Sequence, residues 1–195
     1  MNKCYINNFS TNKKKITVDN VNDIMDSMLP KLNVCVDAID GQVEKTALIA
    51  ACCVRRIPIV TCGGAAGRTD PTQVVCDDIT RAVQCRLLFR CRKNLRDDYG
   101  LFSKGPSDPK KIHKYKARRW RIASVFSMEP QKVVSQSNSN NEVSSFRRCD
   151  GPLGTACFVT GTYGFVAASK VIEMISIQKF PIPKILKQRN KAEQQ

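Results

Sequence analysis

The first hundred residues alternate short apolar runs with longer stretches of helix-forming residues. Runs rich in β-branched residues predict strands at 33–39 and 57–61, and a shorter run predicts another strand at 3–7. The stretches 18–25 and 43–54 predict helices, the first with Asp or Asn in a position to cap its free N–H groups. A strand, a helix and a strand of these lengths form a right-handed crossover unit. The pattern therefore predicts an α/β fold with a mostly parallel sheet.

Polar residues follow two of the predicted strands. Ligands of parallel sheets bind just beyond the carboxyl ends of the strands. Asp37 and Asp40 lie at one such end, and Gly63 and Gly64 lie at the next. Asp40 offers a hard oxygen ligand, which suits Mg²⁺ bound to nucleotide phosphates, but the same residue type at this place is also typical of a helix N-cap. Both interpretations of Asp40 stay open, whereas Asp37, inside the strand, is expected to be a structural hydrogen-bonding residue.

Two further features lie close to these strand ends. Lys45 is one turn into the predicted helix, where its ammonium group would face either an anionic ligand or water. The glycine-rich segment 62–68 would expose backbone N–H groups, as a phosphate-binding loop does. It has the spacing of neither a dinucleotide-binding motif nor a P-loop, and a turn that needs positive φ explains the same glycines. Neither feature identifies a ligand by itself.

Composition divides the chain of 195 residues into four zones. Residues 1–103 hold the alternating strands and helices, and residues 104–147 are expected to form a basic, partly disordered insertion or crossover loop. Residues 148–176 form an apolar block, expected to add a strand and a helix to the same domain, and residues 177–195 form a basic tail. The uncharged stretch 151–169 nearly has the length of a membrane span, but its proline, glycines and threonines predict close packing in a core or a dimer instead.

Positive charge is concentrated in one segment. The chain carries 32 Lys and Arg against 17 Asp and Glu, a formal net charge of +15, which favours an anionic partner such as nucleic acid. Much of this charge lies at 104–121, in Lys104, Lys110, Lys111, Lys114, Lys116, Arg118, Arg119 and Arg121. Such a cluster binds RNA phosphates, and the interleaved Tyr115 and Trp120 would stack on bases. A solvated linker or a nuclear localisation signal has the same composition, so both interpretations stay open.

Ten cysteines and one histidine limit the possible metal and thiol chemistry. No two cysteines have the C-x-x-C spacing, so no four-cysteine zinc site is predicted. The cysteine density is below that of a disulfide scaffold and no secretory segment is visible, so we expect an intracellular protein, cytoplasmic or mitochondrial, with reduced thiols. Cys149 follows Arg147 and Arg148, whose charges favour its thiolate form, although a buried and unreactive cysteine is the commoner case.

Several segments, in order along the chain, carry a resemblance to a known family. They are VDAID at 36–40 with KTALIA at 45–50, PIVTCGGA at 58–65, DPTQ at 70–73, VFSME at 125–129, and Cys149 with GTYGFVA at 161–167. Together they resemble the tRNA threonylcarbamoyladenosine dehydratases, which belong to the ThiF/MoeB-type, ubiquitin-activating-enzyme-like adenylating superfamily. The resemblance extends over most of residues 1–176.

The resemblance implies an ATP-dependent enzyme that adenylates the threonylcarbamoyl carboxylate on tRNA and closes it into a ring with loss of water. By position in the family pattern, Asp40 would help to hold Mg²⁺-ATP, with Lys45 beside it. Cys149 corresponds to a family cysteine that has been considered for covalent or sulfur-related roles. The resemblance also implies a homodimer. The assignment of 104–121 to tRNA contact comes from charge rather than from the family.

One part of the family pattern has no counterpart here. The family begins with a strand, a Gly-rich turn and a helix that cradle ATP, whereas this sequence corresponds to the part that follows. We therefore expect an incomplete Rossmann-like sheet that lacks the N-terminal Gly-rich nucleotide-binding unit, in a truncated chain that binds ATP weakly or not at all. Two functions stay open: the C-terminal part of an ATP-dependent tRNA cyclase, inactive as an isolated fragment, or a non-catalytic basic RNA-binding or scaffold remnant of the same fold.

Overall fold

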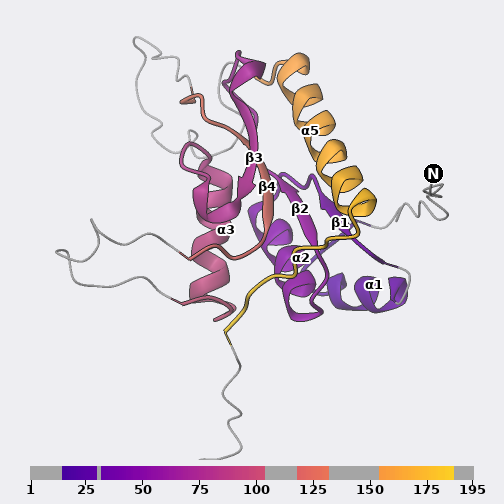
Figure 1. The fold of residues 1–195 in the computed structure, drawn as a ribbon. Helices are drawn as coiled ribbons and strands as arrows, with labels where there is room; N and C mark the ends of the chain where they lie inside the picture. Colours follow the sequence, from indigo (N-terminus) through magenta and orange to yellow (C-terminus); the bar gives the residue numbers. More distant parts are fainter. Residues whose placement is uncertain (1–14, 30–31, 104–117, 132–153, 187–195) are drawn as a thin grey trace, which may run out of the picture.

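Four strands form one sheet in the order β1-β2-β4-β3 (Figure 1). The computed structural model describes residues 15–29, 32–103, 118–131 and 154–186. The strands are β1 (Cys35–Asp37), β2 (Ile59–Cys62), β3 (Val74–Asp78) and β4 (Ala123–Ser127). β1, β2 and β4 run parallel, and β3 runs antiparallel to β4. The predicted α/β fold with a mostly parallel sheet is confirmed.

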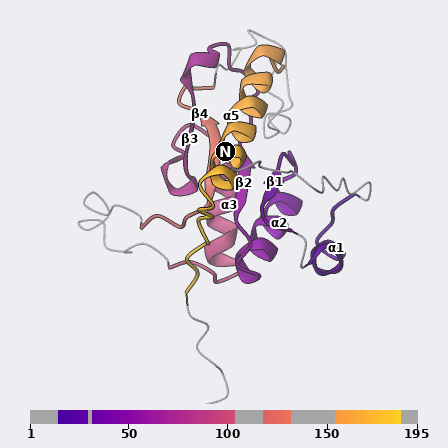
Figure 2. The ribbon, with the colours of Figure 1, turned by 45° about the vertical axis from the view of Figure 1, so that its right-hand side comes forward.

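Helices cover both faces of this sheet (Figures 1 and 2). They are α1 (Val21–Met28), α2 (Gln42–Val54), α3 (Arg86–Asp97) and α5 (Cys157–Ser176), with two short 3₁₀ turns, η1 (Pro71–Gln73) and η2 (Ile79–Arg81). α1, α2 and α3 share an apolar core with one sheet face, which includes Ile49, Leu88 and Phe126. α5 packs on the other face, over Val60 and Val125.

α2 is the central helix of the first face. All its residues from position 45 to position 53 are buried, because the helix lies between the sheet, α1 and α3. Ala47, Ala50 and Ala51 have short side chains, so the backbone of α2 approaches its neighbours closely. The buried helix begins directly after β1 and thereby fixes the position of the loop between them.

Two parts of the fold differ from what the pattern predicted. β4 lies inside the segment 104–147, which was expected to be a loop; the apolar run Ile122–Phe126 is buried in the sheet, although cations precede it along the chain. The polar residue before α1 is Asn20, but its side chain accepts a hydrogen bond from the Thr17 N–H at 2.8 Å and caps no N–H of the helix. The strand predicted at 3–7 lies outside the described residues.

Part of the basic tail is attached to the domain. Residues 177–186, shown in yellow in Figure 1, continue from the end of α5 to Trp120 and Leu101. The Lys184 N–H donates to the Trp120 carbonyl at 2.9 Å, and the Leu186 N–H donates to the Leu101 carbonyl at 2.8 Å. This segment therefore binds the connection between α3 and β4 at two points, one near each end of that connection.

α5 is the longest helix in the described ranges, with 20 residues. Its length alone would suit a bilayer. Among the helices that the structure describes, however, none combines the length with the apolar character that a membrane crossing requires.

Candidate functional site

Asp37, Lys45 and Thr61 form a buried polar group at the carboxyl ends of β1 and β2. Asp37 and Thr61 are register partners on the two strands, and Lys45 points at them from the first turns of α2. The Lys45 Nζ lies 2.8 Å from Asp37 Oδ2, and the Thr61 hydroxyl donates to the same oxygen at 2.6 Å. The side chains of Asp37 and Lys45 are both 0% exposed. Charge compensation and hydrogen bonds make this burial tolerable.

Neither an anionic ligand nor water faces Lys45 in this geometry. Its ammonium group faces neither solvent nor the open end of the sheet, because α2 turns this residue toward the strands. The direct partners of Lys45 are Asp37 and Thr61, the latter at 3.3 Å. Lys45 therefore supports the strand end in this structure rather than presenting its charge to a ligand. The structural role predicted for Asp37 is confirmed.

Asp40 lies in the exposed loop between β1 and α2. The second oxygen of Asp37 accepts the N–H of Ile39 at 2.9 Å, which holds the backbone just before Asp40. The N-cap position of α2 belongs to Gly41, and no side chain caps the helix there. Asp40 is thus an exposed carboxylate beyond the carboxyl end of β1, and the capping interpretation does not apply to it.

The glycine-rich segment after β2 does not present free N–H groups at its glycines. The Gly63 N–H donates to the Val125 carbonyl at 2.8 Å, and the Gly64 N–H donates to the Cys85 sulfur at 3.3 Å. A Cβ on Gly63 would lie 2.7 Å from that same sulfur, so close packing requires glycine there. Gly67 has a φ of 69°, which explains a second glycine by turn geometry. The predicted positive φ is therefore found at Gly67 but not at Gly63 or Gly64, whose N–H groups bind within the fold.

A buried pair that the sequence pattern did not single out holds this segment in place. The Arg68 guanidinium donates to the carbonyls of Gly64, of Gln84 at 2.6 Å and of Glu129 at 3.3 Å. The Glu129 carboxylate accepts the N–H groups of Thr69 and of its neighbour Asp70, both at 2.9 Å. Arg68 and Glu129 are only 4% and 5% exposed. The sequence offered one indication of this buried pair, namely a cation, Arg68, in a glycine-rich and apolar segment.

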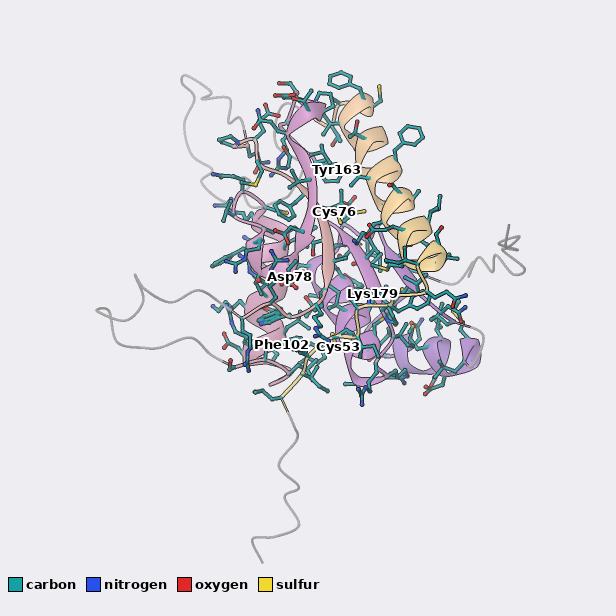
Figure 3. All side chains as sticks on the ribbon, in the orientation of Figure 1. Cys53, Cys76, Asp78, Phe102, Tyr163 and Lys179 are labelled. Atoms are coloured by element: carbon teal, nitrogen blue, oxygen red, sulfur yellow. The ribbon has the colours of Figure 1, made fainter. Side chains whose placement is uncertain are left out.

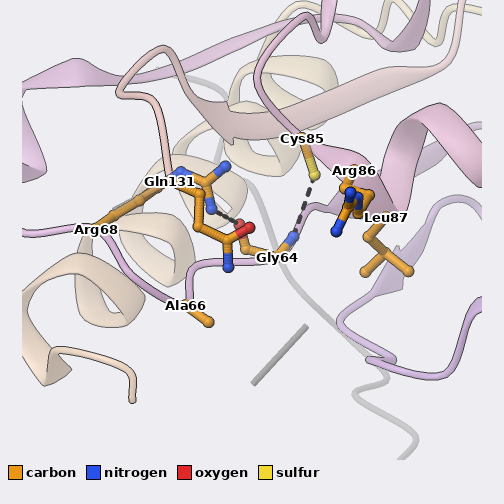
Figure 4. A pocket seen from close by; sticks show the side chains of 7 residues that line it. All are labelled: Gly64, Ala66, Arg68, Cys85, Arg86, Leu87 and Gln131. Carbon is orange, nitrogen blue, oxygen red and sulfur yellow. Dashed lines mark hydrogen bonds between the residues drawn. The ribbon is translucent and has the colours of Figure 1, made fainter. Parts of the chain in front are cut away.

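A small pocket with about 290 Å³ of open space lies beside Arg68 (Figure 4). It is lined by Gly64, Ala66, Arg68, Cys85, Arg86, Leu87 and Gln131. Tyr163 extends from α5 toward the sheet (Figure 3) and donates to the Gly64 carbonyl at 3.3 Å. Burial raises the pKa of Tyr163 to about 12, so it remains a neutral donor. The polar groups around the pocket are largely occupied with holding the loop.

Four of the eight described cysteines are buried, and three more are partly buried. Burial raises the pKa of Cys53 to about 12 and the pKa values of Cys62 and Cys91 to about 11. Cys157, at the start of α5, is exposed. Cys149 lies outside the described residues. Within the parts of the chain that the structure describes, no three His, Cys, Asp or Glu side chains gather to hold a metal ion.

Among the cysteines that the structure describes, alkylation of the native protein is expected to modify Cys157 first. At about pH 8, a pKa near 11 leaves a thiolate fraction roughly a hundredfold below that of an ordinary thiol, so Cys53, Cys62 and Cys91 should react far more slowly. Iodoacetamide labelling followed by peptide mass spectrometry measures each site. In urea all sites should react at similar rates, and equal native rates for Cys53 and Cys157 would contradict the buried environment.

Three arginines of the predicted nucleic-acid cluster are described. Arg118, Arg119 and Arg121 are exposed, and Arg119 lies 3.3 Å from an Asp77 oxygen. Lys104, Lys110, Lys111, Lys114 and Lys116 lie outside the described residues. Trp120 is buried and stacks on Phe102 with ring centroids 3.8 Å apart, so it is not available to a nucleobase. The expectation of base stacking by Trp120 is corrected accordingly.

Curated relatives were found for this chain, although no protein-family model matches it. A tRNA threonylcarbamoyladenosine dehydratase of Haemophilus influenzae is 36% identical over 144 residues, which are 74% of this chain and 51% of that protein. The dehydratase of Escherichia coli K12 is 35% identical and covers 71% of this chain and 50% of its own length. The chain spans about half the length of the curated relatives it matches.

Solved structures show the same relation. The crystal structure of the E. coli enzyme, TcdA, in complex with AMP matches with a TM-score of 0.63 and 32% identity, over 85% of this chain and 56% of that chain. The complex with ATP matches with a TM-score of 0.63 and 30% identity, over 85% and 55%. Sequence and structure agree: the chain is homologous to tRNA threonylcarbamoyladenosine dehydratases over about half of their length.

Proposed function

We propose that this chain supplies the Asp40 side of a Mg²⁺-nucleotide site and acts in the ATP-dependent cyclisation of threonylcarbamoyladenosine in tRNA. The observation that carries the proposal is the exposed Asp40 carboxylate beyond the carboxyl end of β1, in a chain homologous to a dehydratase solved with AMP and ATP. Ligands of open α/β sheets bind at this end of the strands. ATP would adenylate the threonylcarbamoyl carboxylate with loss of pyrophosphate, and ring closure would then form the new C–N bond and expel AMP and a proton, so that the ATP takes up the elements of water lost from the side chain.

The residues present fit a magnesium ion that is held mainly by its nucleotide. Mg²⁺ commonly takes one or two protein carboxylates and completes its coordination with phosphates and water. Asp40 is an exposed carboxylate oxygen donor, and Asp37 holds the backbone just before it through the Ile39 N–H. Asp40 would hold the ion, while the Asp37–Lys45 pair would keep its loop in place.

After depletion of this protein, tRNA is expected to carry the open form of threonylcarbamoyladenosine in place of the cyclic form. Re-expression of the chain should restore the ring, and the Asp40→Asn variant should restore it at least tenfold less, a loss of about 1.4 kcal/mol in transition-state stabilisation. Mass spectrometry of digested tRNA measures both forms. Asp19→Asn, which removes an exposed carboxylate before α1, is the matched control and should restore the ring fully.

Two outcomes would contradict this proposal at different levels. If tRNA modification were unchanged after depletion, the proposed cyclase function would be wrong. If Asp40→Asn restored the ring as completely as the control does, the cyclase function would stand, but Asp40 would have no part in it. Calorimetry with Mg²⁺-ATP adds an independent measurement, in which we expect binding weaker than micromolar for this chain alone.

A second candidate function is RNA binding without turnover, favoured by the exposed Arg118, Arg119 and Arg121 and the net charge of +15. Replacing Lys110, Lys111, Arg118 and Arg121 by glutamine should lower tRNA affinity. It should also reduce the slope of log affinity against log salt by about 3, because each lost phosphate contact removes about 0.7–0.9. Filter binding at several salt concentrations measures the slope.

The control removes the same number of charges elsewhere. Glutamine at Lys13, Lys14, Lys15 and Lys179 leaves the cluster at 104–121 intact and should change the slope by less than half as much. Equal slopes for the two variants would show that tRNA responds to net charge alone, and the cluster would lose its assignment. If the chain bound tRNA but its depletion left tRNA modification unchanged, the second function would be favoured over the cyclase.

A further inference from the structure

The outer side of α3, the helix at the left of Figure 1, carries a row of positive charge. The helix has five cations and one carboxylate. Arg86, Arg90 and Lys93 follow one another about a turn apart on the side opposite the buried Leu95. Within the described ranges, none of these three cations forms an ion pair; the ion pairs lie on other elements. We call Arg86, Phe89, Arg90 and Lys93 the α3 face.

This arrangement of cations is unfavourable for the helix itself. Arg86 stands in the first turn of α3, which has no acidic residue, and a cation there opposes the helix dipole. Arg86 and Arg90 are like charges four residues apart, and so are Arg92 and Arg96; such pairs destabilise a helix. Burial and the nearby charge of Arg96 lower the pKa of Arg92. A bound polyanion would offset these repulsions.

An exposed aromatic ring lies within the row of cations. Phe89 is 54% exposed, and the Arg92 guanidinium lies over its ring, 5.7 Å from the ring centroid. Arg92 is itself held by hydrogen bonds to the carbonyls of Ile79 at 2.6 Å and Ala82 at 2.7 Å. The ring is thus supported at the surface. A positioned aromatic ring among cations is typical of surfaces that stack unpaired bases and bind the neighbouring phosphates.

The α3 face is continuous with the arginines that precede β4. The Arg96 guanidinium lies 5.8 Å from the centroid of the Trp120 ring, and Trp120 stands between the exposed Arg119 and Arg121. Asp78, the N-cap of η2, accepts the N–H groups of Trp120 and Arg121 at 3.1 and 2.6 Å. The 12 residues of α3 alone extend over about 18 Å. A bound strand would pass several phosphates over this distance.

We propose that the α3 face binds an unpaired stretch of RNA, with Phe89 stacking on a base and the cations holding the phosphates beside it. The choice of tRNA as this RNA rests on the proposed function. The charge selects a polyanion, and the supported ring selects one with accessible bases, because an acidic protein surface offers carboxylates but no flat base to stack on Phe89. Phe89 takes the role that Trp120, being buried, cannot fill.

Replacing Arg86, Arg90 and Lys93 together by glutamine tests the cations. The slope of log affinity for tRNA against log salt should fall by about 2, because each phosphate contact contributes about 0.7–0.9 to it. Filter binding with the full chain measures the slope, and circular dichroism checks the fold.

The matched control removes the same charge from other surfaces and leaves the α3 face intact. It replaces three exposed cations by glutamine: Lys15, Arg56 and Lys179. The control should change the slope by less than half as much as the α3 variant. Equal changes in the two variants would overturn the proposal, because tRNA would then respond to net charge and not to this face.

Phe89→Leu tests the stacking. Leucine stays apolar but has no flat ring, so affinity for tRNA should fall roughly tenfold while the salt slope stays the same. Phe89→Tyr keeps a ring and should bind as the wild type does. A fully paired RNA duplex offers no base to stack, so its affinity should not change in Phe89→Leu. Phe158→Leu, which alters an equally exposed phenylalanine on α5, should leave tRNA affinity unchanged.

Two results would contradict base stacking on this face. If Phe89→Leu bound tRNA as tightly as the wild type, or lost affinity for the duplex to the same extent, Phe89 would stack on no base. If poly-glutamate displaced tRNA as readily as a single-stranded RNA does, the face would suit an acidic protein instead. All these measurements are of binding, whereas tRNA modification after depletion decides the cyclase function, so each proposal can fail without the other.

Discussion

Replacing Lys45 by methionine is expected to lower the free energy of unfolding by about 3–5 kcal/mol, because the change leaves the Asp37 carboxylate buried without its counter-charge. Thr61 would still donate to that carboxylate, but one hydroxyl does not replace an ammonium group. Methionine has a similar length and fills the same space, so the loss reports the charge rather than a cavity. Urea unfolding at neutral pH measures it.

Two further variants separate this effect from general sensitivity. Lys170→Met breaks a partly exposed ion pair with Glu173 and should change stability by less than about 0.5 kcal/mol. Adding Asp37→Leu to Lys45→Met removes the unpaired charge and should recover a substantial part of the loss. A loss below about 1 kcal/mol for Lys45→Met alone, within the range of exposed pairs, would contradict the buried pair.

Replacing Arg68 by methionine is expected to lower the free energy of unfolding by about 2–4 kcal/mol. The variant removes the charged donor from the carbonyls of Gln84 and Glu129, and leaves the Gly64 carbonyl with the Tyr163 hydroxyl. Buried carbonyls without a donor carry the cost of their lost hydration. Urea unfolding measures the stability.

Hydrogen exchange gives a local measure of the hydrogen bonds that Arg68 and Glu129 make with this loop. The amides of Thr69 and Asp70 are held by the Glu129 carboxylate, and they should exchange faster once the loop is released. Arg86→Met, at the other side of the same pocket, is the matched control. Arg86 begins α3, where a cation opposes the helix dipole, so its loss should be neutral or slightly stabilising. If both variants lowered the free energy of unfolding by similar amounts, any change at the pocket would be destabilising, and the hydrogen bonds of Arg68 would have no special role.

Much of the fold follows from local pattern. The β-branched runs that became β1 and β2 are too apolar for exposed segments, and the helix-forming stretch between them has the length of one crossover. β3 and β4 were not predicted. Val74–Asp78 ends in two aspartates, and Ala123–Ser127 follows a dense run of arginines, so charge concealed two short strands whose partners lie far away in the sequence.

The candidate site was predictable only in part. Position alone placed Asp40 at the carboxyl end of a strand, because the ends of parallel strands meet at one side of a sheet. The partners of Lys45 were not predictable, since they depend on which face of α2 meets the strands and on the register between Asp37 and Thr61. The role of Arg68 depends on Gln84 and Glu129, which are brought together only by the folded chain.

The sequence by itself determined the class of the fold, the placement of an aspartate at the mouth of its sheet, the basic character of the chain and the resemblance to its relatives, because these follow from residue type, spacing and order. Tertiary structure alone decided which charges are buried, which glycines serve a turn and which face of α5 stays open. Those properties arise from contacts between residues far apart in the chain, which no local pattern encodes.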